Sequence, residues 1–204
     1  MTGFFISLEG IDGCGKTTQW NLLKEYLKKE NKPHKCVREP GSTQLGERLR
    51  TITKDSQIDI APIAEAYLYA TCRAQLVASI IKPALEQGEI VVCDRFLDSS
   101  LVYQGYARTL GQNTVWEINK HAVLGIWPDI TFFLDIPVSV SLDRTAAKQK
   151  DRMEMQNIDF YNKVCEGYKK TASEQQKRIV TINGELPEKD IHEQIAEKLK
   201  KINK

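Results

Sequence analysis

The sequence lacks an excess of charge of either sign, since 29 lysines and arginines stand against 27 aspartates and glutamates, a formal net charge of +2. A nucleic-acid-binding domain is expected to be much more basic than this, so we expect no nucleic-acid partner. The first apolar stretch is only a few residues long, and no basic segment precedes it. It is too short for a membrane span or a signal peptide, so we expect a cytoplasmic protein with a small-molecule partner and no membrane association.

Cysteine is also scarce, and its arrangement argues against two kinds of site. The five cysteines stand at positions 14, 36, 72, 93 and 165. Their number is odd and none lies at CxxC or Cys/His ligand spacing, so we expect neither a disulfide framework nor a zinc site. A reducing compartment fits this usage.

The composition, 41% apolar and 27% charged over 204 residues, is typical of a soluble globular protein, and we expect one domain over residues 1–204. Short apolar runs alternate with segments of helical length. The runs are residues 4–8, 35–38, 90–93, 130–134 and 179–182. This alternation predicts an α/β fold with a five-stranded parallel sheet and helices on both faces. Ligands of such sheets bind at the carboxyl ends of the strands.

The segment GIDGCGKTT, residues 10–18, follows the first predicted strand and matches the pattern G-x-x-x-x-G-K-[ST]. Its glycines allow backbone N–H groups to turn toward an anion, and Lys16 adds a positive charge. Residues 17–29 have helical apolar spacing, so a bound phosphate would lie at a helix N-terminus. The predicted nucleotide contacts are Gly10, Ile11, Asp12, Gly13, Cys14, Gly15, Lys16, Thr17 and Thr18.

Two other interpretations of this loop are weaker. A chance glycine turn is disfavoured because the full pattern and both flanking elements agree. A dinucleotide-binding G-x-G-x-x-G pattern fails because its third glycine would fall at Thr18. Cys14, close to Lys16 and a helix N-terminus, is either a thiol of lowered pKa or an inert small side chain.

Basic residues near the ends of other predicted elements could bind an anion together with the phosphate loop. Arg38 and Arg95 directly follow buried strands, and Arg73 lies on a predicted helix. Each alone could be a surface charge, but together at the edge that carries Lys16 they favour anion binding, because guanidinium groups hold phosphate oxygens in fixed directions. Asp94 ends a strand and could hold Mg²⁺ together with the Thr17 hydroxyl, or could instead pair with Arg95.

These residues belong to longer segments that resemble the bacterial thymidylate kinases over nearly the whole chain. The segments are FFISLEGIDGCGKTTQ, REPGSTQLGERLR, CRAQL with IKPALEQG, VVCDRFLDSSLVYQGYARTLG, WPDITFFLD and KDRME. The resemblance implies a P-loop NTPase type fold with a short lid at about residues 145–157. It also implies ATP-dependent phosphorylation of dTMP to dTDP, with Mg²⁺, in a homodimer.

The resemblance also implies roles for matching residues. Arg95 is similar to the arginine that bridges the acceptor phosphate toward the transferring phosphoryl group, and Arg38 resembles its partner on the monophosphate. Asp12 matches a carboxylate that accepts the 3′-hydroxyl. Tyr69 stands where the family usually has a phenylalanine under the thymine ring, and Arg73 is its neighbour on the same helix face, a donor to the base O4.

Further residues match the pocket for base and sugar. Arg50, Ser100 and Gln104 resemble base-pocket contacts, and Tyr103 resembles the tyrosine that crowds the sugar 2′ position. The family's second glycine after Arg-Glu-Pro is replaced by Ser42, which either adopts the glycine's geometry or changes the approach to the phosphate.

The catalytic residues are expected to be Lys16, Arg95 and Asp12, joined by a cation of the lid. Relatives without an arginine in the phosphate loop commonly carry one in the lid. Lys148 and Arg152 are the leading candidates, and the choice among them, Lys150 and Arg144 stays open.

Other functions remain possible at this point. The chain could be a kinase for another pyrimidine monophosphate or for a deoxynucleoside. It could also be a GTP switch or an ATP-driven assembly protein without small-molecule chemistry. A switch is disfavoured because residues 119–122, NKHA, lack the final aspartate of a guanine-reading motif, and no protein-kinase motif is present.

Overall fold

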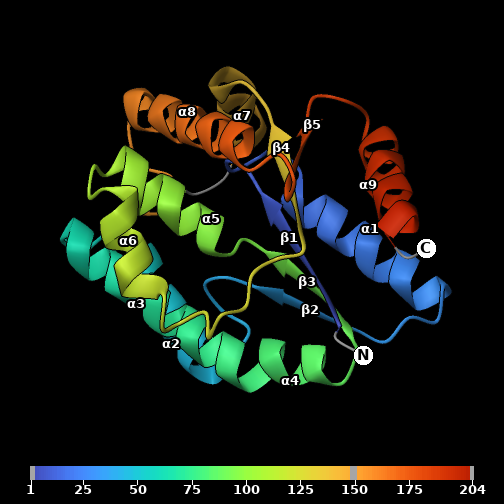
Figure 1. Ribbon diagram of the computed structural model, residues 1–204. Coiled ribbons are helices and arrows are strands. Elements are labelled where there is room, and N and C mark those ends of the chain that lie inside the picture. The colour runs from blue at the N-terminus through green and yellow to red at the C-terminus, as the bar shows by residue number, and fades with distance from the viewer. Residues whose placement is uncertain (1–2, 148–150, 203–204) are drawn as a thin grey trace.

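The computed structural model describes residues 3–147 and 151–202, and its centre is a five-stranded sheet (Figure 1). All five predicted strands are confirmed, each within about a residue or two of its expected ends. They are β1 (Phe4–Glu9), β2 (His34–Arg38), β3 (Ile90–Asp94), β4 (Ile130–Asp135) and β5 (Ile179–Asn183). Every neighbouring pair is parallel, in the order β2-β3-β1-β4-β5. The carboxyl ends of the three central strands therefore meet at one edge.

Helical segments connect the strands, as the alternation of the sequence predicts. They are α1 (Lys16–Lys29), α2 (Gln44–Lys54), α3 (Pro62–Leu76), η1 (Val77–Ile81), α4 (Lys82–Glu86), α5 (Leu97–Ser100), η2 (Leu101–Ala107), α6 (Gln112–Asn119), α7 (Val138–Thr145), α8 (Ile158–Glu174) and α9 (Glu188–Ile202). Helices α1 and α9 cover one face of the sheet, while α3, α4, α5 and α8 lie on the other (Figure 1). Within the described ranges, no helix is long and apolar enough to cross a membrane.

Side chains of β1 alternate between two cores. Phe5 packs with the cluster that contains Leu76, whereas Ile6 packs with the cluster that contains Leu23 of α1. Period-two alternation on a strand covered on both sides produces this division. The two-layer packing holds β1, and with it the loop that follows, rigidly in the centre.

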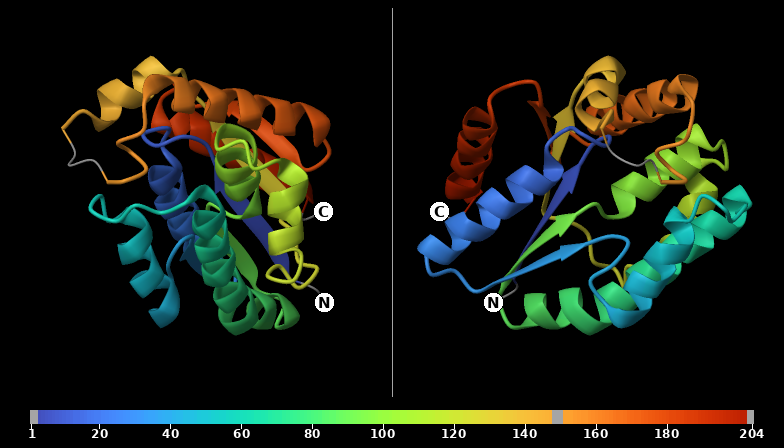
Figure 2. Two further views of the ribbon diagram at one scale, coloured as in Figure 1. Left: turned by 90° about the vertical axis from the view of Figure 1, so that its left-hand side faces the viewer. Right: turned by 180° about the vertical axis from the view of Figure 1, so that it is seen from behind.

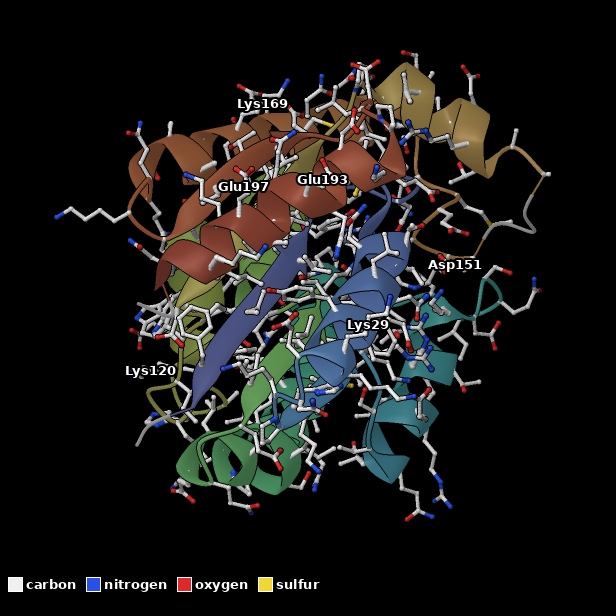
Figure 3. The ribbon with its side chains drawn as sticks, turned by 90° about the vertical axis from the view of Figure 1, so that its right-hand side faces the viewer. Lys29, Lys120, Asp151, Lys169, Glu193 and Glu197 are labelled. Carbon is white, nitrogen blue, oxygen red and sulfur yellow. The ribbon has the colours of Figure 1, made fainter. Side chains whose placement is uncertain are left out.

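Helix α9 shows how the surface is kept polar over the same core. Ile191 and Ile195 are buried against the sheet, and Glu193 and Glu197 point outward (Figure 3). This spacing is that of an amphipathic helix on a globular protein.

Two features were not predicted from the sequence. Segments η1 and η2 are π-helical, and η2 buries Tyr103 and Gln104. Such wide turns often occur at functional sites, because the extra residue per turn redirects side chains. The sequence carries no composition signal for them.

The predicted lid begins where α7 ends and continues in turns. Its residues 151–157 lie beside the end of α2 (Figure 2). The Arg152 N–H donates to the Lys54 carbonyl at 3.1 Å, and the Lys54 ammonium lies 2.6 Å from the Asp151 carboxylate. Residues 148–150 lie outside the described residues.

The position of α1 depends on its buried face, and Leu23→Ala tests this. Leu23 is 0% exposed, so its truncation should lower the free energy of unfolding by about 2–5 kcal/mol through lost transfer energy and a cavity. Glu25→Ala, on the exposed side of the same helix, is the matched control and should change it by less than about 0.5 kcal/mol. Urea unfolding measures both, and equal effects would contradict the packing described.

Candidate active site

The phosphate loop between β1 and α1 has the backbone that its glycines permit. Gly10, Gly13 and Gly15 have φ values of +140°, +76° and +99°, a region that residues with a Cβ rarely adopt. A Cβ built at Gly15 meets nothing within 4 Å, so the loop is open above this position. Because α1 begins at Lys16, the open space lies at a helix N-terminus, where an anion is favoured.

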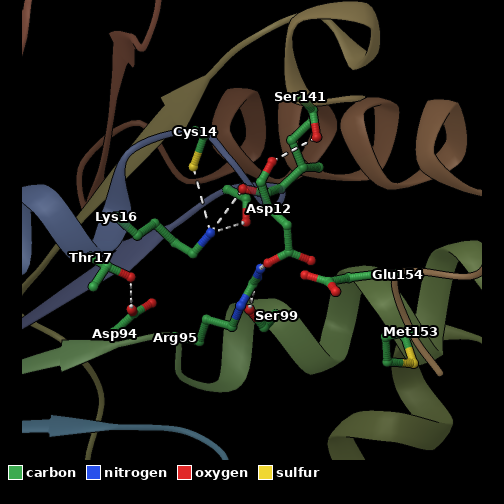
Figure 4. Close-up of polar contacts among 12 residues, drawn as sticks. Asp12, Cys14, Lys16, Thr17, Asp94, Arg95, Ser99, Ser141, Met153 and Glu154 are labelled. Atoms are coloured by element: carbon green, nitrogen blue, oxygen red, sulfur yellow. Dashed lines mark hydrogen bonds and ion pairs between the residues drawn. The ribbon is translucent and has the colours of Figure 1, made fainter. Parts of the chain in front are cut away.

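The Lys16 side chain folds back over this loop (Figure 4). Its Nζ donates to the carbonyls of Gly10 at 3.1 Å and Ile11 at 2.8 Å, and lies 3.6 Å from the Cys14 Sγ. The loop carbonyls thus hold the ammonium group inside the loop. Cys14 is 0% exposed, which favours the interpretation as an inert small side chain.

Asp94, at the end of β3, faces Thr17 across the same opening. The Thr17 Oγ1 donates to the Asp94 carboxylate at 3.3 Å. A hydroxyl and a carboxylate oxygen are the hard ligands that Mg²⁺ prefers when a nucleotide and water complete its shell. The pair therefore fits the predicted metal site, although among the described residues no group of three or more His, Cys, Asp or Glu side chains is arranged for a metal.

Arg95 follows Asp94 with an unusual backbone and connects two elements. Its φ is +70°, and its Nη2 donates to the Asp12 carboxylate at 2.8 Å. Burial raises the pKa of Asp12, but the charges of Arg95 and Lys16 outweigh this and lower it to about 2. Asp12 is therefore ionised at neutral pH and joins the phosphate loop to the end of β3.

Glu9, which was not singled out from the sequence, shares two hydrogen-bond partners with Arg95. Its buried carboxylate accepts hydrogen bonds from the Phe96 N–H at 2.7 Å, Ser99 Oγ at 2.6 Å and Tyr168 Oη at 2.9 Å. Arg95 Nη1 in turn donates to Ser99 Oγ at 3.2 Å and Tyr168 Oη at 3.3 Å. Burial raises the pKa of Glu9. The sequence signal that could have identified this residue is a glutamate within a buried strand, because a buried carboxylate needs hydrogen-bond partners.

Two cavities open on either side of Arg95. One, about 690 Å³, contains most of the predicted acceptor residues, and the other, about 1220 Å³, is lined by the phosphate loop. Asp12 and Arg95 line both. The predicted residues in the first cavity are Arg50, Tyr69, Arg73, Ser100, Tyr103 and Gln104. The predicted residues that line the second are Gly13, Gly15, Lys16, Thr17, Thr18, Arg38, Arg50 and Asp94.

Arg73 is fully buried at the floor of the acceptor cavity. Its guanidinium donates to Glu39 Oε2 at 2.6 Å, to Ser100 Oγ at 3.1 Å and to the Phe96 carbonyl at 3.2 Å, and also to Asn119. Glu39 Oε1 has no hydrogen-bond partner among the described residues. Burial raises the pKa of Glu39 to about 7, against the lowering effect of Arg73.

Arg38 lies on the phosphate-loop side and is half-exposed. Its Nη2 contacts both Glu47 carboxylate oxygens at 3.1 Å, so the guanidinium is directed by an acid that sequence analysis did not single out. Ser42 has a φ of +64° and accepts from the Arg38 N–H at 2.8 Å. The serine thus adopts left-handed, glycine-like geometry and holds the strand end.

Of the candidate lid cations, the structure describes Arg144 and Arg152, and these two contact different parts of the chain. Arg152 donates to Glu65 at 2.6 Å and to the Thr53 carbonyl at 2.9 Å, away from the phosphate loop. Arg144 donates to the Gly13 carbonyl at 3.2 Å and lines the larger cavity. Lys148 lies outside the described residues, as does Lys150. A catalytic role for Lys148 or Arg152 stays a prediction.

Besides Glu39, two further residues line both cavities and were not assigned a role from the sequence. Lys54 ends α2, and Glu154 belongs to the KDRME segment. Figure 4 shows the Glu154 carboxylate directed toward Asp12 and Arg95. The match of KDRME to the resembled family was the only signal for Glu154.

The raised pKa of Glu39 predicts a pH-dependent stability that Glu39→Gln removes. Between pH 4.5 and about 7 the folded protein keeps a proton that the unfolded chain has released, so stability falls as pH rises. The unfolding free energy of the wild type minus that of the variant should therefore drop by about 3 kcal/mol over this interval. Urea unfolding at pH 4.5, 6 and 7.5 measures it, and a constant difference would show that Glu39 is ionised throughout.

Comparisons with known proteins identify the family of the chain. The thymidylate kinase family model matches residues 8–195. The chain is 48% identical to thymidylate kinase of Thermoanaerobacter sp. (strain X514) over 201 residues, covering 98% of this chain and 99% of the relative. It is 46% identical to that of Caldanaerobacter subterraneus subsp. tengcongensis over 196 residues, 96% and 94% of the two chains.

A solved structure gives the same result at the level of the fold. The thymidylate kinase of Ehrlichia chaffeensis is 31% identical, with a TM-score of 0.79 and coverage of 98% and 99% of the two chains. This confirms the P-loop NTPase type of the parallel sheet. On the family match, the sequence identities and the fold together, the chain belongs to the thymidylate kinase family.

Proposed function

We propose that this protein transfers the γ-phosphoryl group of ATP to dTMP, producing dTDP, as a single domain over residues 1–204. The observation that carries the proposal is the adjacency of two cavities that share Asp12 and Arg95. One contains a phosphate-binding loop and the other a base-sized pocket with an aromatic ring and a buried arginine. Phosphoryl transfer needs chiefly this alignment of donor and acceptor and the neutralisation of phosphate charge.

The donor side is formed by the loop and the start of α1. The loop N–H groups and the Lys16 ammonium bind the terminal phosphates of ATP, because Gly15 and Lys16 line the larger cavity where α1 begins and the space above Gly15 is open. Mg²⁺ would be held by Thr17 and by Asp94, and when bound it neutralises phosphate charge. The residues of this side are Gly10, Ile11, Asp12, Gly13, Cys14, Gly15, Lys16, Thr17 and Thr18.

The acceptor side is formed by β2, β3, α3 and η2. Arg95 binds the dTMP phosphate on the side that faces Lys16, and Arg38 approaches it from the end of β2. The fork of Arg95 is held by Asp12, Ser99 and Tyr168, so its direction is set before substrate binds. A preorganised guanidinium stabilises the charge of the transferring group without reorganisation during the reaction.

The base and sugar occupy the rest of this cavity. The Tyr69 ring supports the thymine face, and Arg73, with Ser100 beside it, meets the polar edge of the base. Ionised Asp12 accepts the 3′-hydroxyl. Tyr103, whose hydroxyl has no partner among the described residues, crowds the 2′ position, and Arg50 and Gln104 complete the pocket.

The proposal also includes an oligomeric state and a cellular compartment. Exposed apolar side chains on α2 and α3, Leu45, Ile52, Ile63 and Tyr67, support a homodimer that covers them. The five cysteines are free thiols in the structure, which supports a reduced, cytoplasmic protein.

ADP release measured over a panel of monophosphates tests the function. With ATP and Mg²⁺, dTMP should be the best acceptor, and dUMP should be about 10–100-fold poorer in kcat/KM because the apolar niche for the 5-methyl group is left unfilled. Thymidine should not be phosphorylated, because it lacks the phosphate that Arg38 and Arg95 bind and that receives the phosphoryl group.

Two results would contradict the proposed function and favour another one. A preference for dCMP over dTMP would indicate a kinase for another pyrimidine monophosphate. ATP consumption independent of every monophosphate would favour an ATP-driven assembly protein.

A further inference from the structure

Glu65, on the first turn of α3, is a buried charge that the reaction scheme above does not use. Its side chain is 0% exposed. Its carboxylate accepts hydrogen bonds from Gln104 Nε2 at 2.8 Å, Arg152 Nη2 at 2.6 Å and Arg108 Nη2 at 3.3 Å. The two guanidinium groups compensate the buried charge, which would otherwise be costly. Three segments distant in the sequence therefore meet on one carboxylate.

The first of these bonds sets the orientation of the Gln104 amide. An ionised carboxylate can only accept, so Gln104 must turn its NH₂ group toward Glu65. Gln104 lines the acceptor cavity, and among the described residues no hydrogen bond is made to its Oε1. The carbonyl oxygen is therefore the amide atom left for a ligand in that cavity.

A carbonyl oxygen at this place distinguishes pyrimidines by their N3 atom. Thymine and uracil carry a hydrogen on N3 and can donate to Gln104 Oε1. Cytosine has an unprotonated N3, which would face the same oxygen as a second acceptor. A buried polar pair without a hydrogen atom between its members is costly, so this orientation disfavours cytosine.

The other two bonds hold residues 151–157, a segment that lines part of the acceptor cavity. Arg152 anchors residues 151–157 directly, and Arg108 also donates to Gln156 at 3.0 Å. Met153 and Glu154 of the same segment line the acceptor cavity (Figure 4). The Glu65 carboxylate thus holds both the Gln104 amide and the segment 151–157 at this cavity.

We propose that Glu65 is a positioning residue for pyrimidine selection: it turns the carbonyl of Gln104 toward the base N3 and holds residues 151–157 over the bound monophosphate. The proposal rests on the proposed function, since it assigns the base to the cavity lined by Gln104. It adds a specificity determinant that does not itself touch the substrate.

Glu65→Gln tests it, because a carboxamide can also donate and so allows Gln104 to present its NH₂ to the base. We expect the ratio of kcat/KM for dTMP to that for dCMP to fall about tenfold, and the KM for dTMP to rise about tenfold. Arg178→Gln is the matched control, since it breaks the buried pair of Arg178 with Asp98, at 2.7 Å, outside both cavities. It should lower the melting temperature without changing the ratio.

Gln104→Met is a second variant that leaves Glu65 and both arginines in place. It should lower the same ratio, and combining it with Glu65→Gln should lower the ratio little further. An unchanged ratio in Glu65→Gln, or in Gln104→Met should the first variant not fold, would overturn the proposal. A wild-type protein that converts no dTMP would instead contradict the proposed function itself.

Discussion

The contact between Arg95 and Asp12 is the interaction on which the site depends. It joins the end of β3 to the loop after β1 at 2.8 Å, between the two cavities. Both partners are also held by other contacts, because Lys16 donates to the Ile11 carbonyl beside Asp12 and Arg95 donates to Ser99 and Tyr168. The parallel register of β1 and β3 brings the two strand ends together, so the fold itself sets the distance between donor and acceptor.

A second constraint is that the polar and ionisable groups buried near this contact must have hydrogen-bond partners. Glu9 is satisfied by Ser99 and Tyr168, and Arg73 by Glu39 and Asn119. Replacing such pairs with apolar residues can be neutral for stability, whereas removing one partner is costly. The structure therefore holds its polar groups in fixed directions, and catalysis by preorganised charge requires that property.

Much of this architecture could be predicted from the sequence, because its signals are local. The strands appear as short apolar runs, and the phosphate loop is contiguous from Gly10 to Thr18. The partners of Arg95 and of Glu65 could not be predicted, since they come from segments up to 87 residues away. The pairing of Arg38 with Glu47 and the contact of Arg152 with Glu65 likewise depend on packing that no motif encodes.

Arg95→Lys measures the central claim most directly, since lysine keeps the charge but has no planar fork to hold two phosphates in fixed directions. Turnover of dTMP with ATP and the separate binding of each nucleotide by calorimetry should be determined on the same preparation. The account predicts that kcat falls by about 100-fold or more while each dissociation constant changes by less than about tenfold. A kcat within about twofold of the wild type would contradict it, because a point charge would then stabilise the transferring group as well as the planar guanidinium does.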